Sequence, residues 1–177
     1  MKTRVLVAYA SRYGSTQEVA RAIADTLREN SFEVDLKPIQ DVKSLEEYTA
    51  VVLGAPLYMV HWHKDAHKFL SWHRENLTKM PVAIFALGPL NDEEEEWKEV
   101  RAQLDKELAK FPWIRPVAAE IFGGKLDPEK LRFPDNLISR LPASPIHNKP
   151  ASDLRDWAAI RAWASSLAAR FQSALPQ

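Results

Sequence analysis

The sequence predicts an α/β domain with a doubly wound, five-stranded parallel sheet in the order 2-1-3-4-5 and helices on both faces. Three short runs, at residues 4–9, 50–55 and 82–87, are almost continuously apolar, as in strands buried on both faces. Residues 32–39 instead alternate apolar and polar side chains and include Pro38, which favours an edge strand. This order places a ligand crevice between the first and third strands, at their carboxyl ends.

The helix expected after the first strand spans residues 16–30. Its apolar side chains recur three and four positions apart, for example at Val19, Ile23 and Leu27, and form one stripe. Ser15 and Glu18 match the Ser-x-x-Glu capping box, in which each side chain accepts a hydrogen bond from the other residue's main-chain N–H. The pattern therefore predicts that Ser15 caps this helix.

Three further helices and one more strand complete the predicted domain. The helices are expected over residues 64–76, 93–110 and 152–175, and the fifth strand over residues 116–122. The last helix has an apolar stripe, so it should dock on the sheet. Residues 123–150, between the fifth strand and this helix, are rich in proline and far longer than the ~2–6 residues usual for such a connection. We expect them to form an insert in a single domain of residues 1–177.

Composition narrows the classes of function. Lys+Arg and Asp+Glu both number 24, so net charge gives no reason to expect nucleic acid as a partner. The absence of cysteine excludes disulfides, thiolate metal sites and cysteine nucleophiles, and no metal site is predicted. The first residues lack the apolar core of a signal peptide, and no apolar run reaches the ~20 residues of a membrane span. We expect a cytoplasmic protein or one peripheral at a membrane; the oligomeric state stays open.

The loop after the first strand carries the strongest chemical signal. It lies within AYASRYGSTQEVA (residues 8–20), where the hydroxyls of Ser11, Ser15 and Thr16 surround Gly14 at a helix N-terminus, a setting that suits phosphate. The loop lacks the first glycine and the lysine of a nucleoside-triphosphate loop and the three glycines of a dinucleotide site. A single phosphate is the predicted ligand. The alternative is that these hydroxyls only cap the helix.

The segment SRYGST (residues 11–16) resembles the phosphate loop of flavodoxins, [ST]-x-T-G-x-T, and the predicted strand order is the flavodoxin order. The departure is Tyr13, where flavodoxins usually have threonine. The resemblance implies a flavodoxin-like fold with FMN as the cofactor and an aromatic ring near its ribityl chain. The residues that it places around the phosphate are Ser11, Arg12, Gly14, Ser15 and Thr16, and Tyr13 is expected to contact the cofactor beside them.

Two further loops resemble the flavin-facing loops of flavodoxin-domain proteins. They follow the third and fourth strands and read GAPLYMVHWHK (residues 54–64) and LGPLNDEEEEW (residues 87–97). For each aromatic residue, packing against the next helix is an equal alternative. The expected cofactor contacts here are Pro56, Leu57, Tyr58, Met59, Trp62, Gly88, Pro89, Leu90, Asn91 and Asp92.

The second half of the chain resembles the part of the flavodoxin-domain family that includes the menaquinone-dependent protoporphyrinogen oxidases. The similarity lies in EIFGGKL (residues 120–126), in the long insert containing RFPDNLISRL (residues 132–141), and in the final helix. It implies an FMN-dependent oxidoreductase that oxidises protoporphyrinogen IX with a quinone as acceptor. The insert would then border an apolar substrate bearing carboxylates through Leu131, Phe133, Leu137, Ile138 and Leu141, with Arg132 and Arg140. The alternative is that the insert only covers the edge of the sheet.

Several points stay open at this level. The alternative function is a flavodoxin-like electron carrier that serves a protein redox partner. Peripheral contact with a membrane is a further expectation for the insert. A histidine beside the flavin, among His61, His63 and His67, could relay protons or hold a carboxylate. No catalytic residue is predicted.

Overall fold

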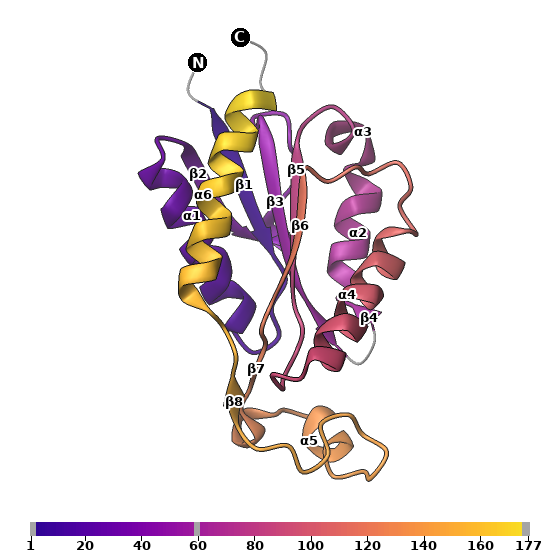
Figure 1. The fold of residues 1–177 in the computed structure, drawn as a ribbon. Coiled ribbons are helices and arrows are strands. Elements are labelled where there is room, and N and C mark those ends of the chain that lie inside the picture. Colours follow the sequence, from indigo (N-terminus) through magenta and orange to yellow (C-terminus); the bar gives the residue numbers. More distant parts are fainter. Residues whose placement is uncertain (1–2, 59–60, 175–177) are drawn as a thin grey trace.

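The structure, a computed structural model, describes residues 3–58 and 61–174, and of Tyr58 only the main chain. Five parallel strands form the central sheet in the order β2-β1-β3-β5-β6 (Figure 1). Since β5 and β6 are the fourth and fifth of these strands along the chain, the predicted order is confirmed. The strands are β1 (Arg4–Tyr9), β2 (Glu33–Pro38), β3 (Ala50–Tyr58), β5 (Val82–Leu87) and β6 (Ala118–Phe122).

Helices cover both faces of the sheet, as expected. Helices α1 (Ser15–Glu29) and α6 (Trp157–Ala174) lie together on one face (Figure 1). Helices α2 (Lys64–Trp72), α3 (Arg74–Leu77) and α4 (Glu94–Leu108) lie on the other, and a 3-10 turn, η1 (Ile39–Asp41), follows β2. The two-residue strand β4 (His61–Trp62) pairs antiparallel with the end of β3.

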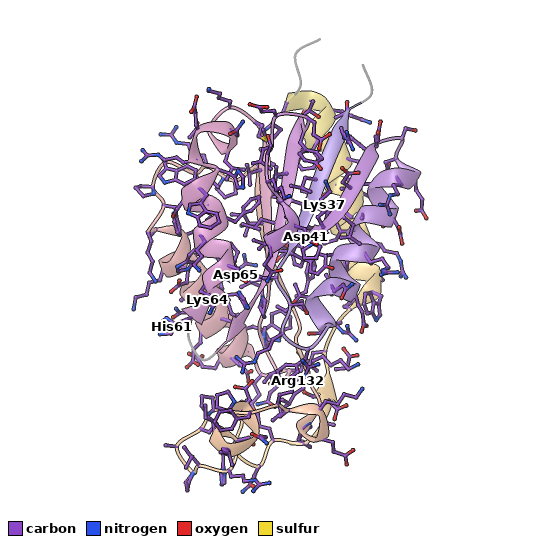
Figure 2. The ribbon with its side chains drawn as sticks, turned by 180° about the vertical axis from the view of Figure 1, so that it is seen from behind. Lys37, Asp41, His61, Lys64, Asp65 and Arg132 are labelled. Carbon is purple, nitrogen blue, oxygen red and sulfur yellow. The ribbon has the colours of Figure 1, made fainter. Side chains whose placement is uncertain are left out.

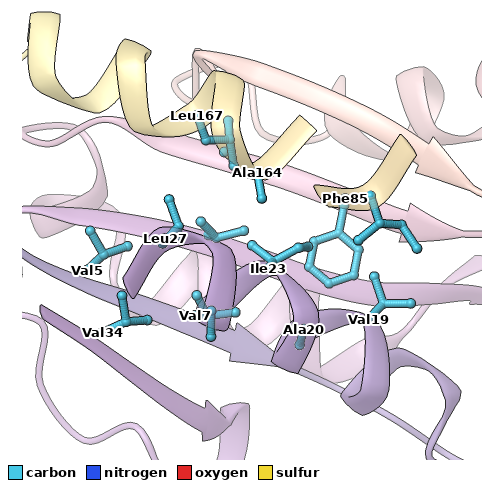
Figure 3. Close-up of a cluster of buried hydrophobic side chains, with 14 of the residues drawn as sticks. Val5, Val7, Val19, Ala20, Ile23, Leu27, Val34, Phe85, Ala164 and Leu167 are labelled. Carbon is cyan, nitrogen blue, oxygen red and sulfur yellow. The ribbon is translucent and has the colours of Figure 1, made fainter. Parts of the chain in front are cut away.

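Two separate apolar layers result from the alternation of side chains along each buried strand. On one side, Val5 and Val7 of β1 pack with Ile23 of α1 and Leu167 of α6 (Figure 3). On the other side, Leu6 of β1 belongs to a layer formed with residues of α2 and α4. The near-continuous apolar runs thus match strands buried on both faces.

The start of α1 differs from the prediction. The residue before the helix is Gly14, with a φ of 88°, and no side chain caps the first turn. The capping box is therefore wrong. Ser15 is already the first residue of the helix, and Glu18 accepts a hydrogen bond from Arg155 Nη1 at 2.9 Å. The hydroxyl before the helix that does accept a main-chain hydrogen bond is that of Ser11, from Gly14 N at 2.9 Å.

Two other helix boundaries differ because the chain turns locally. The helix expected over residues 64–76 is interrupted at His73, which separates α2 from α3. The last helix begins at Trp157 rather than residue 152, because Ser152 and Asp153 form strand β8 (Ser152–Asp153). Strand β8 pairs antiparallel with β7 (Lys125–Leu126).

The β7–β8 pair encloses residues 127–151, here called the lobe. The lobe contains a 3-10 turn, η2 (Pro128–Lys130), and one short helix, α5 (Asp135–Ile138), and it lies beyond the carboxyl ends of the sheet strands (Figure 1). At its base, Arg155 binds Asp153 through Nη2 at 2.7 Å and Glu18 through Nη1 at 2.9 Å, although its side chain is only 3% exposed. This buried guanidinium therefore joins the base of the lobe to the first turn of α1.

Candidate functional site

A cavity of about 580 Å³ opens at the carboxyl ends of the strands, between the loops that follow β1, β3 and β5 and the lobe. Its volume lies in the range of ligand pockets, ~300–1,000 Å³. Its place is the crevice that the strand order predicted. Eight of the expected cofactor residues line it: Arg12, Tyr13, Ser15, Thr16, Pro56, Leu57, Gly88 and Leu90.

Five other expected residues, described below, are not among those that line the cavity. Ser11 and Gly14 are joined by the hydrogen bond of the first loop. Pro89 is buried, and its carbonyl accepts a hydrogen bond from Gly124 N at 2.7 Å. Asp92 is exposed and accepts a hydrogen bond from Trp97 Nε1 at 3.3 Å, whereas Asn91 is half-buried.

Trp62 is not in the cavity wall. Its side chain is 2% exposed, belongs to the core layer on the side of α2, and donates a hydrogen bond from Nε1 to the Ala55 carbonyl at 3.2 Å. Burial of this large ring and satisfaction of its polar atom give it a packing role in place of the stacking role suggested for it. The side chain of Tyr58 and all of Met59 lie outside the described residues.

The first loop has the geometry of an anion site. Gly14 adopts the left-handed conformation that glycine favours, and α1 begins directly after it, with its free N–H groups. Thr16 is 1% exposed, lines the cavity, and its Oγ1 has no hydrogen-bond partner. A buried hydroxyl without a partner is unfavourable, so this atom is suited to a ligand that accepts its proton. The loop thus fits a phosphate.

Arg12 and Tyr13 of the same loop interact with the lobe. Asp135 of α5 is 1% exposed, and its Oδ2 lies 2.7 Å from Arg12 Nε and accepts the hydrogen bond of the Tyr13 hydroxyl. Tyr13 Oη in turn accepts a hydrogen bond from Arg132 N at 3.3 Å. Figure 2 shows Arg132 where the lobe meets the lower end of the sheet. The tyrosine that departs from the flavodoxin loop is therefore part of a polar contact with the lobe.

The loop after β5 is held from two directions. Glu96 Oε1 accepts a hydrogen bond from Leu90 N at 2.7 Å, and Glu96 Oε2 lies 3.8 Å from Lys149 Nζ of the lobe. Gly88 N donates to the Phe122 carbonyl at 3.1 Å. These contacts fix the main chain of residues 88–90 along the cavity. They also give the lobe a second polar contact with the sheet domain.

His63 lines the cavity beside the loop after β3. Its Nδ1 accepts a hydrogen bond from Asp65 N at 3.2 Å, so the neutral ring carries its proton on Nε2. Burial lowers the pKa of His63 below its ordinary value, and the neighbouring cations Lys64 and Arg12 add to this effect against the carboxylate of Asp65. Figure 2 shows Lys64 and Asp65 near the lower end of α2, toward the lobe. At neutral pH His63 is a hydrogen-bond donor in the cavity wall.

The other histidines of this region serve a different contact. His67 Nε2 lies 2.6 Å from Glu107 Oε2, and Lys110 Nζ lies 2.8 Å from Glu107 Oε1. Burial opposes ionisation of Glu107, but Lys110 and His67 hold its pKa below the ordinary value. Within residues 3–58 and 61–174 no three acidic or histidine side chains are arranged as a metal site.

Of the residues that the insert was expected to present to a substrate, Leu131 does line the cavity, whereas the other lining residues from this part of the chain carried no signal that sequence reasoning could use. The lobe contributes Lys130, Leu131, Ile146 and Lys149 to the wall, and Leu126 of β7 also lines it. By contrast, Phe133, Leu137 and Leu141, which were expected to border a substrate, are 74%, 49% and 57% exposed and are not among the lining residues. Arg132 and Arg140 are likewise exposed and outside the lining. Periodicity cannot show which side of an irregular lobe faces a cavity.

The fold and this site define a flavodoxin-type protein. The family model of the flavodoxin domain matches residues 6–151, so the chain belongs to this family. FMN is accordingly its cofactor, as expected from the first loop. No helix of the described residues is long and apolar enough to cross a membrane.

Two named relatives and one solved structure are similar to this chain over most of its length. The chain is 26% identical over 144 residues to the protoporphyrinogen IX dehydrogenase [quinone] of Escherichia coli K12, and the aligned part makes up 80% of this chain and 78% of that protein. It is 25% identical over 174 residues to the Leishmania major protein of the same name, covering 94% and 75%. Among solved structures, oxidised flavodoxin 1 from Bacillus cereus matches with a TM-score of 0.60 and 18% identity, covering 98% of this chain and all (100%) of the other.

Proposed function

We propose that this protein is an FMN-dependent oxidoreductase with its cofactor in the cavity at the carboxyl ends of the strands. The phosphate is assigned to Gly14–Thr16 and the ring system to the walls at residues 56–57 and 88–90. The observation that carries this assignment is the unpartnered, buried Thr16 hydroxyl at the cavity end where α1 begins. FMN, when bound, supplies the redox chemistry, while the protein determines access and orientation.

For the substrate, we propose protoporphyrinogen IX as reductant and a quinone as acceptor. The support is the name shared by the E. coli and L. major relatives, together with the apolar lining at Leu126, Leu131 and Ile146. Lys125 and Lys130 also line the cavity, so they are better placed than the exposed arginines of the lobe to meet substrate carboxylates. His63 Nε2 is the donor that we assign to hydrogen-bond a substrate or flavin oxygen.

The central experiment is anaerobic. Purified protein should be yellow and release FMN on denaturation, and protoporphyrinogen IX should bleach the bound flavin until a quinone restores its colour. A colourless protein that rejects added FMN would refute the cofactor site. A yellow protein that neither reactant changes would refute only the substrate.

A matched pair of variants tests the role of the lysines. Lys130→Gln should raise KM for the carboxylated substrate with little change in kcat, because it removes a binding charge from the cavity wall. Arg140→Gln removes an exposed charge of the same lobe outside the lining and should leave KM unchanged. Equal effects of both changes would favour general electrostatic attraction over a defined contact.

The alternative function is an electron carrier for a protein partner. The observation that favours it is the group of exposed glutamates at the rim, Glu93, Glu95 and Glu99, which could guide a basic partner. A carrier should show two resolved one-electron steps in a potentiometric titration and reduce its partner at a rate that falls with salt. Failure of the quinone to accept electrons, together with these two results, would favour the carrier.

We also propose peripheral contact with an anionic membrane. The lobe exposes Phe133 and Leu141 beside the cationic side chains of Arg132 and Arg140, a combination of apolar and basic groups that suits a lipid surface. Such contact would bring the cavity near membrane quinones. Cosedimentation with anionic vesicles should be strong, weak with neutral vesicles, and reduced by Phe133→Ser. Equal recovery with both kinds of vesicle would contradict the proposal.

A further inference from the structure

We propose that Asp135 is a positioning residue for the phosphate loop: through Tyr13 and Arg12 it holds residues 12–16 in the form that receives the FMN phosphate. The inference rests on the FMN site proposed above and adds a residue from the lobe to it. Asp135 is 122 positions away from Tyr13 in the sequence. The contact therefore joins the insert to the first loop of the domain.

The burial of Asp135 is unusual for its surroundings. The carboxylate belongs to a four-residue helix whose neighbours Phe133 and Leu137 are 74% and 49% exposed, yet Asp135 itself is 1% exposed. Burial of a carboxylate is unfavourable unless charge and hydrogen bonds compensate for it. Arg12 Nε at 2.7 Å and the Tyr13 hydroxyl provide that compensation. At this edge the lobe docks through a polar contact, not through its large apolar side chains.

The direction of the hydrogen bonds assigns Tyr13 a supporting role. A phenol has one proton, and Tyr13 donates it to Asp135, while Tyr13 Oη accepts from Arg132 N. The hydroxyl therefore has no second proton for a phosphate. Asp135 does not take the place of the phosphate, because Thr16 Oγ1 stays without a partner. The loop thus has two parts: Arg12 and Tyr13 line the cavity and also contact the lobe, whereas Ser15 and Thr16 line the cavity where α1 begins.

Anchoring residues 12–13 matters because Gly14 follows them. Glycine has the largest conformational freedom of any residue, so an unanchored loop loses more entropy when it closes on a phosphate. The coupling must also act in reverse: FMN bound through its phosphate should stabilise the docked lobe. Riboflavin, which lacks the phosphate, should not.

The test compares FMN with riboflavin in Tyr13→Phe, Asp135→Asn and the double variant. Loss of a hydrogen bond to a charged group predicts that Tyr13→Phe weakens FMN binding about tenfold. Riboflavin affinity should not change. The double variant should be no weaker than the weaker single variant, because both changes remove the same contact. Additive losses, or equal losses for FMN and riboflavin, would overturn the inference.

A second readout needs no flavin. Trypsin can cut after the exposed residues Arg132 and Arg140 of the lobe. In the FMN-free protein Tyr13→Phe should be cut about tenfold faster, and in the wild type FMN, but not riboflavin, should slow the cut. Unchanged cleavage would refute the contact even if the protein never bound FMN. If the wild type binds no FMN and Tyr13→Phe is still cut faster than the wild type, only the proposed function is refuted, and the contact with the lobe stands.

The chain offers a matched control far from the cavity. Tyr48 donates its hydroxyl proton to Asp35 Oδ2 at 2.7 Å, and Arg4 Nη2 donates to the same atom at 2.9 Å. This set has the same chemistry as Tyr13, Asp135 and Arg12, but Arg4 opens β1 at the amino end of the sheet. Tyr48→Phe should lower stability and leave the ratio of FMN to riboflavin affinity unchanged. A change of that ratio equal to the change in Tyr13→Phe would count against the positioning role.

Discussion

Replacing Thr16 with valine should have opposite effects on the FMN-free protein and on FMN binding. The two side chains have nearly the same shape, so the change removes the hydroxyl and little else. Thr16 Oγ1 is buried and has no partner, and such a hydroxyl costs about 1–3 kcal/mol. Thr16→Val should therefore raise the free energy of unfolding of the FMN-free protein by about 1–2 kcal/mol. For a chain of this size, each kcal/mol raises Tm by about 2–4 °C.

The same change should weaken FMN binding. If the hydroxyl donates to the phosphate, its loss removes a hydrogen bond to a charged group, worth about 1.5–3 kcal/mol, or roughly 10- to 150-fold in Kd. Urea unfolding of the FMN-free protein and fluorescence titration with FMN and riboflavin measure the two effects. Riboflavin affinity should not change, because riboflavin lacks the phosphate that we assign to this loop.

Thr26 supplies the control within the same helix. It is 5% exposed, but its Oγ1 donates to the Ala22 carbonyl at 2.9 Å, so its hydroxyl is satisfied. Thr26→Val should be neutral or destabilise by about 1 kcal/mol and leave FMN binding unchanged. The reasoning fails if Thr16→Val destabilises the FMN-free protein as much as Thr26→Val, or if it binds FMN like the wild type.

Three further changes test the core and two buried ion pairs. Gly54→Ala places a Cβ 1.9 Å from Cζ of the fully buried Phe85, so urea unfolding should show a loss of about 3 kcal/mol. Glu107→Gln should cost about 1–2 kcal/mol at pH 7 by the loss of its ion pairs. Folding lowers the pKa of Glu107, so its contribution to stability is present above the ordinary value of 4.5 and is lost as pH falls through the folded pKa. The unfolding free energies of wild type and variant should therefore converge in acid. Arg155→Lys loses the paired contacts to Asp153 at 2.8 and 2.7 Å, so it should lower the free energy of unfolding by about 2 kcal/mol and speed tryptic cleavage of the lobe. Unchanged Tm and cleavage would contradict the role of Arg155 at the base of the lobe.

Sequence reasoning succeeded where the determinant is local. The strands at residues 4–9 and 82–87 have the predicted bounds, and Pro38 closes an edge strand as expected, because burial on two faces or one leaves a pattern along the chain itself. The loop at residues 11–16 could be predicted as a phosphate site for the same reason, because a site at a helix N-terminus is built from consecutive residues. Helix boundaries were less accurate, since the capping role of Ser15 depends on the conformation of Gly14.

By itself, then, the sequence determined the strand order and the place of the crevice, and it predicted a phosphate loop beside that crevice. Only the tertiary structure decided that Trp62 lies in the core, and that Tyr13 and Arg12 bind Asp135. It also decided that Lys130 and Lys149 of the lobe line the cavity, whereas Arg132 and Arg140 of the lobe do not. Periodicity and motifs report on neighbours in the chain, whereas a contact between residues 122 positions apart forms only after the sheet has brought both ends of the domain together.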